Sequence, residues 1–341
     1  MTTLSGTREK RARRATMNDV ARLAGVSIKT VSRVVNDEPG VHEQTARQVL
    51  AAIESLGFRR NMGARNLRQG VTTATVGLLL EDVSNPFYSG LTRGVEEVAR
   101  QFGRRVLSAS SDEDPVQARE LALDFCARRV DGLLIVPAGR EQGYLAAEIR
   151  AGTPVVFIDR PGGDVTADTV LMDNVGGTMM AVAHLAGHGH RRIGFLGDDP
   201  EIFTAAERLR GFRRGCARAG IERGAEFAAM GPHDEHSIGS ALRAMFDRSV
   251  TALIGGNNRI TIGLLRVLAG MPERPALIGF DDFELADLLD PPVTVIAHDA
   301  KALGHAAAGR LFARIQGDDS PHRDLVLPAR LVPRGSGEVA P

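Results

Sequence analysis

The first 60 residues alternate between apolar and polar positions with the period of short amphipathic helices. Apolar side chains recur at intervals of three and four over 17–24, 28–35 and 43–56, which predicts one helix in each range. Gly25 lies where the first helix should end, because glycine readily takes the left-handed conformation found there. Two helices that share an apolar inner face across a glycine-containing turn predict a helix-turn-helix unit, with a third helix behind it.

From residue 74 onward the pattern changes to apolar runs of strand length that alternate with helical stretches. The run TVGLLL at 75–80 comes first, and a helical pattern over 86–102 follows it. This alternation predicts an α/β body of doubly wound parallel sheets covered by helices on both faces. There are too many strands for one sheet, and the polar break DRPGGD at 159–164 indicates two halves. Further strands are expected at 104–110, 132–137, 154–159, 192–197, 226–230, 251–256 and 275–280, and further helices at 115–128, 141–151, 174–189, 205–219, 238–247 and 259–269.

Composition adds a charge asymmetry to this pattern. The chain has 341 residues, of which 43% are hydrophobic and 25% charged, and its net charge is zero, as in a globular protein of two or three domains. Residues 1–70 contain 13 Lys or Arg against 6 Asp or Glu, a balance of +7, so the remainder carries −7. A basic head on an acidic body predicts that the head binds a polyanion, although residues 1–14 alone are better interpreted as a disordered basic tail.

Several classes of protein find no support in the sequence. No apolar run has the length of a membrane span, and no apolar signal segment follows the charged N-terminus, so we expect a cytoplasmic protein with no membrane partner. Cys126 and Cys216 are expected to be free thiols. His184 and His188 have helical spacing, but no adjacent carboxylate completes a metal site. P-loop, dinucleotide-binding and nucleophile-elbow motifs are absent, so we expect no enzyme activity, no metal and no cofactor.

The helix at 28–35 has the polar face of a DNA-reading helix. Lys29 and Arg33 lie one turn apart and can donate to guanine O6 and N7, while Ile28 can contact a thymine methyl group. Short polar side chains nearby suit phosphates, which position a helix without specifying sequence. An ordinary solvated amphipathic helix is the alternative interpretation. The short polar side chains are those of Ser27, Thr30, Ser32 and Asn36.

These motifs resemble one family of bacterial proteins. TMNDVARLAGVSIKTVSRVVN, followed by VHEQTARQVLAAIESLGF, is similar to the DNA-binding head of the LacI/GalR (lactose/galactose repressor) family of transcriptional regulators, and the resemblance extends to about residue 336. It implies a sequence-specific DNA-binding regulator, expected to be a repressor. His42 departs from the pattern, because relatives usually have a serine there that caps the third helix.

The segment NMGARNLRQG at 61–70 would be read as a linker from its sequence alone, since it is too short to hold a helix in water. The resemblance implies instead a hinge helix that folds on the operator and inserts a leucine into the minor groove. Leu67 occupies the position of that leucine and Arg68 follows it. The expected domains are a helix-turn-helix domain at 15–60, a hinge and linker at 61–73, and an effector-binding and dimerisation body at 74–341.

The resemblance further implies a body like that of periplasmic sugar-binding proteins, with a small-molecule effector in the cleft between two subdomains. Subdomain 1 is expected at about 74–160 and 294–319, and subdomain 2 at about 161–293 and 320–341. Ligands of such sheets bind at the carboxyl ends of strands, where polar side chains gather here. Helix caps and ion pairs between the subdomains are the alternative roles for these side chains. The candidate effector-binding residues are Asp82, Phe87, Tyr88, Asp159, Arg208, Asn257 and Asp281.

The sequence therefore predicts a transcriptional regulator whose affinity for operator DNA is controlled by a small molecule. Carboxylates and amides around one or two aromatic rings favour a sugar or polyol as effector, with a nucleobase as the alternative. A solute-binding transport protein is the rival from another class, and the helix-turn-helix argues against it. We expect a homodimer on a pseudo-palindromic operator, because one head reads only a few bases. Asn258 departs from the family, where an aspartate usually follows Asn257.

Overall fold

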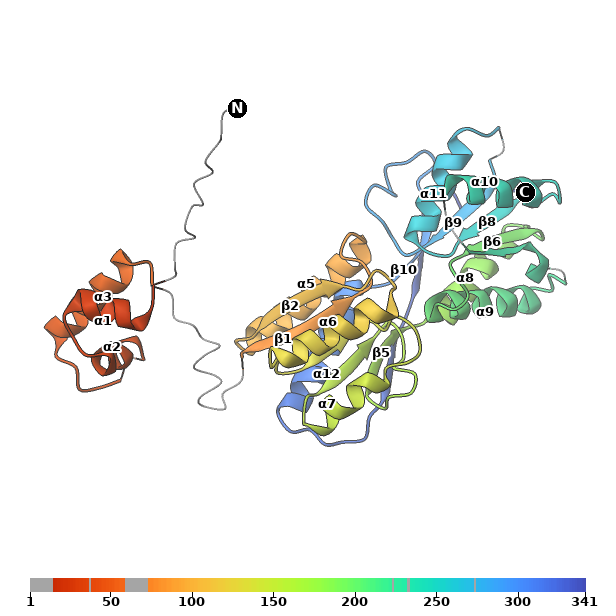
Figure 1. The fold of residues 1–341 in the computed structure, drawn as a ribbon. Coiled ribbons are helices and arrows are strands. Elements are labelled where there is room, and N and C mark those ends of the chain that lie inside the picture. The colour runs from red at the N-terminus through yellow and green to blue at the C-terminus, as the bar shows by residue number, and fades with distance from the viewer. Residues whose placement is uncertain (1–14, 37, 59–72, 223, 232–233, 273) are drawn as a thin grey trace, which may run out of the picture. The chain divides into compact units, whose positions relative to one another are not determined.

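The computed structural model describes the chain except for residues 1–14, 37, 59–72, 223, 232–233 and 273. The chain divides into two compact units, Met1–Val71 and Thr72–Pro341 (Figure 1). The expected basic tail lies outside the described residues, and so does most of the hinge, including Leu67 and Arg68.

The first unit has, within its described residues, the three helices that the sequence predicts. Gly25 follows the first of them in the left-handed conformation, with φ at 67°. The Ser27 side chain caps the second by accepting a hydrogen bond from the Thr30 N–H at 3.1 Å. His42 replaces the usual serine cap of the third, and its Nδ1 accepts from the Gln44 N–H over a long 3.4 Å. The helices are α1 (Met17–Ala24), α2 (Ile28–Val35) and α3 (Glu43–Ser55), around a core of Val20, Ala21, Val31, Val49 and Ala52.

The first half of the second unit is a parallel sheet with the strand order β11-β5-β4-β3-β1-β2. Alternate side chains of its strands face opposite layers of helices, because successive residues of a strand point to opposite faces. Val76, Leu78 and Leu80 pack with α5 and α12, whereas Leu79 packs with α6. The elements are β1 (Thr75–Leu80), α5 (Pro86–Gln101), β2 (Arg105–Ser110), α6 (Pro115–Ala127), β3 (Leu133–Ile135), η1 (Gly143–Leu145), α7 (Ala146–Arg150), β4 (Val155–Ile158), β5 (Asp168–Met172), α12 (Ala300–Ile315) and β11 (Asp324–Leu327).

The second half repeats this arrangement with the order β12-β10-β9-β8-β6-β7, in which only β12 runs antiparallel to its neighbour. One face of its sheet packs with α8 and α9 and the other with α10 and α11. Its elements are α8 (Asn174–Gly187), β6 (Ile193–Gly197), α9 (Phe203–Arg218), η2 (Gly224–Phe227), β7 (Ala228–Met230), α10 (Glu235–Phe246), β8 (Ala252–Gly255), α11 (Asn258–Ala269), β9 (Ala276–Phe280), β10 (Thr294–Ala297) and β12 (Arg330–Val332). The expected class, an all-α head with a body of two parallel-sheet subdomains, is confirmed.

The chain crosses between the two halves three times, and each crossing comes later than the sequence suggested. β5 belongs to the first sheet, so the first crossing follows Met172 instead of residue 160. β10 belongs to the second sheet, which moves the next crossing from 293 to a point after Ala297. The last crossing, expected at 319, follows Leu327. Strands next to the crossings are short and carry polar residues, so their apolar patterns did not stand out.

Candidate functional site

The polar face of α2 carries the side chains that the sequence assigned to DNA. Ile28, with 48% of its surface accessible, and Lys29 are exposed, while Val31 on the other face is completely buried. Among the described residues, neither Lys29 nor Arg33 forms an ion pair. The short polar residues bond to one another, with Ser27 Oγ 2.9 Å from Thr30 Oγ1 and Asn36 Nδ2 donating to Ser32 Oγ at 3.3 Å. Within the described residues, α2 therefore has two cations without an ion pair and one exposed aliphatic side chain on this face.

A cleft of about 530 Å³, including its open mouth, lies where strands of both halves end. The first half contributes residues after β1, β2 and β4, and the second half contributes residues after β6, β8 and β9 together with α9. Six of the seven expected effector-binding residues line this cleft. Asp82 does not line it, because its carboxylate is bound by Ser84 and Arg259 at the edge. The lining residues are Glu81, Asn85, Phe87, Tyr88, Glu113, Asp159, Arg160, Asp198, Ile202, Thr204, Ala205, Arg208, Gly256, Asn257, Arg259 and Asp281.

Two aspartates occupy equivalent positions in the two halves. Asp159 follows β4 and Asp281 follows β9, and both have left-handed backbones with φ at 66° and 65°. Each N–H continues the sheet, donating to Val170 O at 2.8 Å and Ile296 O at 2.9 Å respectively. A left-handed conformation is unfavourable for residues other than glycine and is typical of functional sites. Each half thus contributes one aspartate with a left-handed backbone to the lining of the shared cleft.

Arg208 is held in place by protein acceptors of the second half. Its Nε donates to Asn174 Oδ1 at 2.7 Å, and one terminal nitrogen donates to Gly256 O at 2.8 Å and to Asp281 Oδ2 at 3.2 Å. The guanidinium also lies 4.0 Å from the centre of the Phe280 ring. Burial disfavours ionisation of Asp281, but Arg208 and His298 outweigh it and hold the pKa below its ordinary value. Arg208 thus stabilises the second half as well as lining the cleft.

The first half contributes an acidic network that the sequence reading missed. Arg160 donates to Glu113 Oε2 at 2.7 Å and to Pro137 O at 3.0 Å. Glu81 accepts from the Tyr88 hydroxyl at 2.9 Å, and burial, together with the nearby charge of Glu113, raises its pKa. Glu81 directly follows β1, so it could have been predicted in the same way as the other polar residues at the carboxyl ends of strands. Glu113 gave no such signal, because it enters the cleft from a turn with a φ of 60°.

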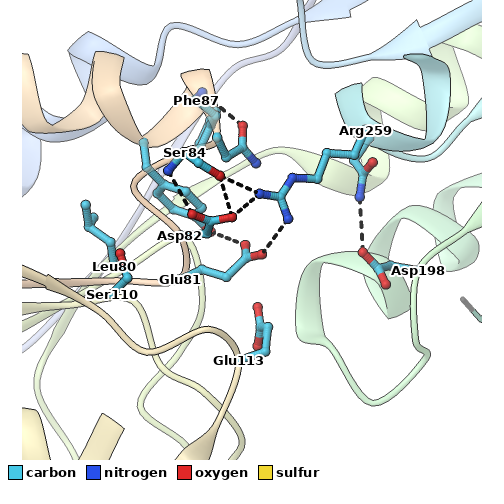
Figure 2. A network of polar contacts seen from close by, with 12 residues as sticks. Leu80, Glu81, Asp82, Ser84, Phe87, Ser110, Glu113, Asp198 and Arg259 are labelled. Atoms are coloured by element: carbon cyan, nitrogen blue, oxygen red, sulfur yellow. Dashed lines mark hydrogen bonds and ion pairs between the residues drawn. The ribbon is translucent and has the colours of Figure 1, made fainter. Parts of the chain in front are cut away.

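Hydrogen bonds bridge the two halves at one edge of the cleft (Figure 2). Arg259, near the start of α11, contacts Asp82 and lies 3.3 Å from Ser84 Oγ and 3.9 Å from Glu81 Oε1. Asn258 Nδ2 donates to Asn85 Oδ1 at 2.9 Å, so the residue that departs from the family takes part in the bridge.

Asn257, expected to bind effector, mainly organises the second half. Its Oδ1 caps α11 by accepting from the Ile260 N–H at 2.8 Å, and its Nδ2 donates to Asp198 Oδ2 at 3.2 Å. The alternative role as a helix cap therefore applies to this residue, although it also lines the cleft.

The histidines near 184–190 are structural. His184 Nε2 lies 2.5 Å from Glu338 Oε1, and His190 Nε2 lies 2.8 Å from Val339 O, so both fasten the C-terminal segment. In the described part of the chain, no group of three or more His, Cys, Asp or Glu side chains is arranged to hold a metal ion. None of the described helices is both long and apolar enough to span a membrane.

Comparisons with known proteins agree with this architecture. Residues 16–61 match the family model described as "Bacterial regulatory proteins, lacI family", and residues 182–337 match a "Periplasmic binding protein-like domain". The transcriptional repressor PurR of Photobacterium profundum is 32% identical over 94% of this chain and 98% of its own. A solved complex of the regulator CelR with cellobiose is 30% identical, with a TM-score of 0.70, covering 95% and 100% of the two chains. The Lac repressor dimer bound to operator and an anti-inducer is 25% identical, with a TM-score of 0.79, over 96% and 100%.

A helix-turn-helix head joined to a two-half binding body defines a DNA-binding transcriptional regulator, and not an enzyme. The chain belongs to the LacI family of bacterial regulators.

Proposed function

We propose that this regulator is a cytoplasmic repressor whose hold on operator DNA is set by a sugar or polyol in the cleft. One observation carries the proposal: residues of both halves line a single cleft rich in hydrogen-bonding groups and containing the aromatic Phe87. A ligand there can favour one arrangement of the halves over another, which is what control of a distant site requires. The related CelR binds cellobiose, which supports a carbohydrate.

The proposal assigns the direct reading of bases to Lys29, Arg33 and Ile28 on α2, and phosphate contacts to the short polar residues around them. Leu67 and Arg68 are assigned to the minor groove. The effector contacts are assigned to Phe87, Tyr88, Asp159, Arg208, Asn257 and Asp281, with Asp82 at the edge of the cleft. The unit that binds DNA is a homodimer on an inverted repeat. The related Lac repressor is bound to its operator as a dimer, which supports this assembly.

Gel shifts with DNA from the gene's own upstream region test the proposal. Operator binding should survive raised salt better than binding to random DNA, and Lys29→Ala should remove that difference. Arg22, an exposed arginine on α1 and not on α2, provides the control variant Arg22→Ala. A sugar or polyol should change operator affinity, and light scattering should give the mass of a dimer. Equal binding of operator and random DNA at every salt concentration would contradict the proposal.

A nucleobase is the alternative effector. Phe87 offers a ring for stacking, whereas Tyr88 is only 2% exposed and packs edge-on against Phe87 at 5.2 Å between centres. A base would thus have one aromatic face available and not a pair of them, which favours the sugar. Thermal-shift measurements with matched sets of sugars and nucleosides decide between the two.

A further inference from the structure

Each of the three arginines that line the cleft is paired with a carboxylate. Arg208 pairs with Asp281 at 3.2 Å, and Arg160 pairs with Glu113 through both of its terminal nitrogens. Arg259 contacts Asp82 at the edge. Each guanidinium that lines the cleft therefore has its own carboxylate, and little positive charge is left for a ligand.

Three of the carboxylates that line the cleft remain after this pairing, and one of them, Asp198, accepts a hydrogen bond from Asn257 Nδ2 at 3.2 Å. Asp159 lines the cleft but is only 4% exposed, and its buried Oδ1 has no hydrogen-bond partner. Glu81 accepts from Tyr88, but its nearest guanidinium nitrogens, on Arg160 and Arg259, lie 3.6 and 3.9 Å away and serve other carboxylates more closely. Burial raises the pKa of Asp159 and of Glu81, as expected for carboxylates with too little compensating positive charge.

Building on the proposed function, we propose that the effector is a hydroxyl-rich molecule that carries a cationic amine, and that Asp159 and Glu81 bind its ammonium group. An ionised carboxylate buried without a counter-charge costs several kcal/mol. A ligand ammonium supplies the missing charge and donates hydrogen bonds to Asp159 Oδ1. A neutral hydroxyl can donate the hydrogen bond, but it leaves the charge uncompensated. A phosphorylated or carboxylated ligand would add a like charge to an acidic wall.

Matched compounds isolate the contribution of the amine. Glucosamine with glucose, and galactosamine with galactose, differ by one ammonium group in place of one hydroxyl, and glucose 6-phosphate is the anionic counterpart. Titration calorimetry of the full-length chain measures their binding. We expect one amino sugar to bind at least about tenfold more tightly than its hydroxyl partner, and the phosphate not to bind.

Two variants connect this preference to named residues. Asp159→Asn keeps the shape of the side chain and removes only its charge, and because Oδ1 has no partner, folding should not suffer. Glu81→Gln provides a second, independent removal. Each should bring the ratio of amine to hydroxyl affinity close to one. Asp282→Asn is the control, since Asp282 pairs with Arg334 and does not line the cleft.

The outcomes are distinguishable. Equal or weaker binding of the amino sugar within both pairs overturns this inference, and if the neutral sugar then alters operator binding, the proposed function still stands. An amine preference that persists in both variants shows that other residues recognise the amine. If neither these compounds nor nucleosides bind or change operator affinity, the proposed function fails and this inference fails with it.

Discussion

Arg259 should control how readily the two halves of the body separate. Its guanidinium joins α11 of the second half to Asp82 and Ser84 of the first, while Arg259 and Asp82 side chains remain 46% and 24% exposed. An ion pair at that exposure contributes about 0.5–1 kcal/mol. Arg259→Gln should therefore reduce the ratio of bridged to separated arrangements by up to roughly fivefold. A ligand that needs the bridged arrangement would bind correspondingly more weakly.

The assay is ligand titration of Arg259→Gln at low and high salt, with Arg266→Gln as a matched control. Arg266 lies on the same helix, is exposed and does not line the cleft. The difference between wild type and Arg259→Gln should shrink at high salt, because screening weakens the bridge in the wild type. If both variants bind ligand with the same affinity as the wild type at low salt, the bridge contributes nothing and the reasoning is refuted.

The same bridge should be insensitive to pH over the physiological range. Hydrogen bonds from Ser84, reinforced by Arg259, lower the pKa of Asp82 to about 2. Because the pKa of Asp82 is depressed, the stabilisation that the ionised Asp82 gives to the bridge is fully present above the ordinary pKa of 3.8. It is lost only as the pH falls through about 2. The affinity ratio between wild type and Arg259→Gln should consequently stay constant from pH 5 to 8. If the affinity ratio changes between pH 5 and 8, the strength of the bridge depends on a titrating group other than Asp82, and this prediction is wrong.

Three further substitutions test other parts of the molecule. Arg208→Ala should weaken effector binding at least about tenfold by calorimetry, with operator gel shifts nearly unchanged. It should also lower the melting temperature, because it leaves the buried carboxylate of Asp281 without its arginine partner. Leu67→Ala should cost a few kcal/mol of operator affinity per dimer but leave binding to random DNA unaffected, whereas equal losses would contradict a minor-groove wedge. Asp168→Asn should lower the free energy of unfolding in urea by about 3 kcal/mol, because it removes the buried partner of Arg310 and Arg314; an unchanged midpoint would show that these arginines find other acceptors.

Periodicity was sufficient to predict most of the architecture. The helices at 17–24 and 28–35 have the predicted bounds, because strong caps at Thr16 and Ser27 fix their starts. The central strands were equally clear, since each is an apolar run buried on both faces. β5 was missed because it begins with Asp168, a buried carboxylate whose arginine partners lie more than 140 residues away in the chain. Nothing local in the sequence reveals such a partner.

The cleft was predicted less completely than the fold, for a related reason. Strand ends are visible in the sequence, so Asp159 and Asp281 could be selected, whereas the residues that approach them from turns could not. The sequence also did not show which of the polar residues at strand ends bond to their neighbours and which remain available to a ligand. Asp82 and Asn257 follow strands like the others, but they bond to neighbouring polar groups. Only the distances separate residues that organise the cleft from residues that remain available to a ligand.

The three crossings constrain how the body can move. Three separate connections, after Met172, Ala297 and Leu327, join the two halves, and together they restrict the rotation of one half relative to the other more than a single connection would. The head is joined to the body through β1, which belongs to the first half alone. The second half, which holds Arg208 and Asp281, has no covalent route of its own to the DNA-binding helices. A ligand held by the second half can therefore act on the head along the chain only by shifting the first half.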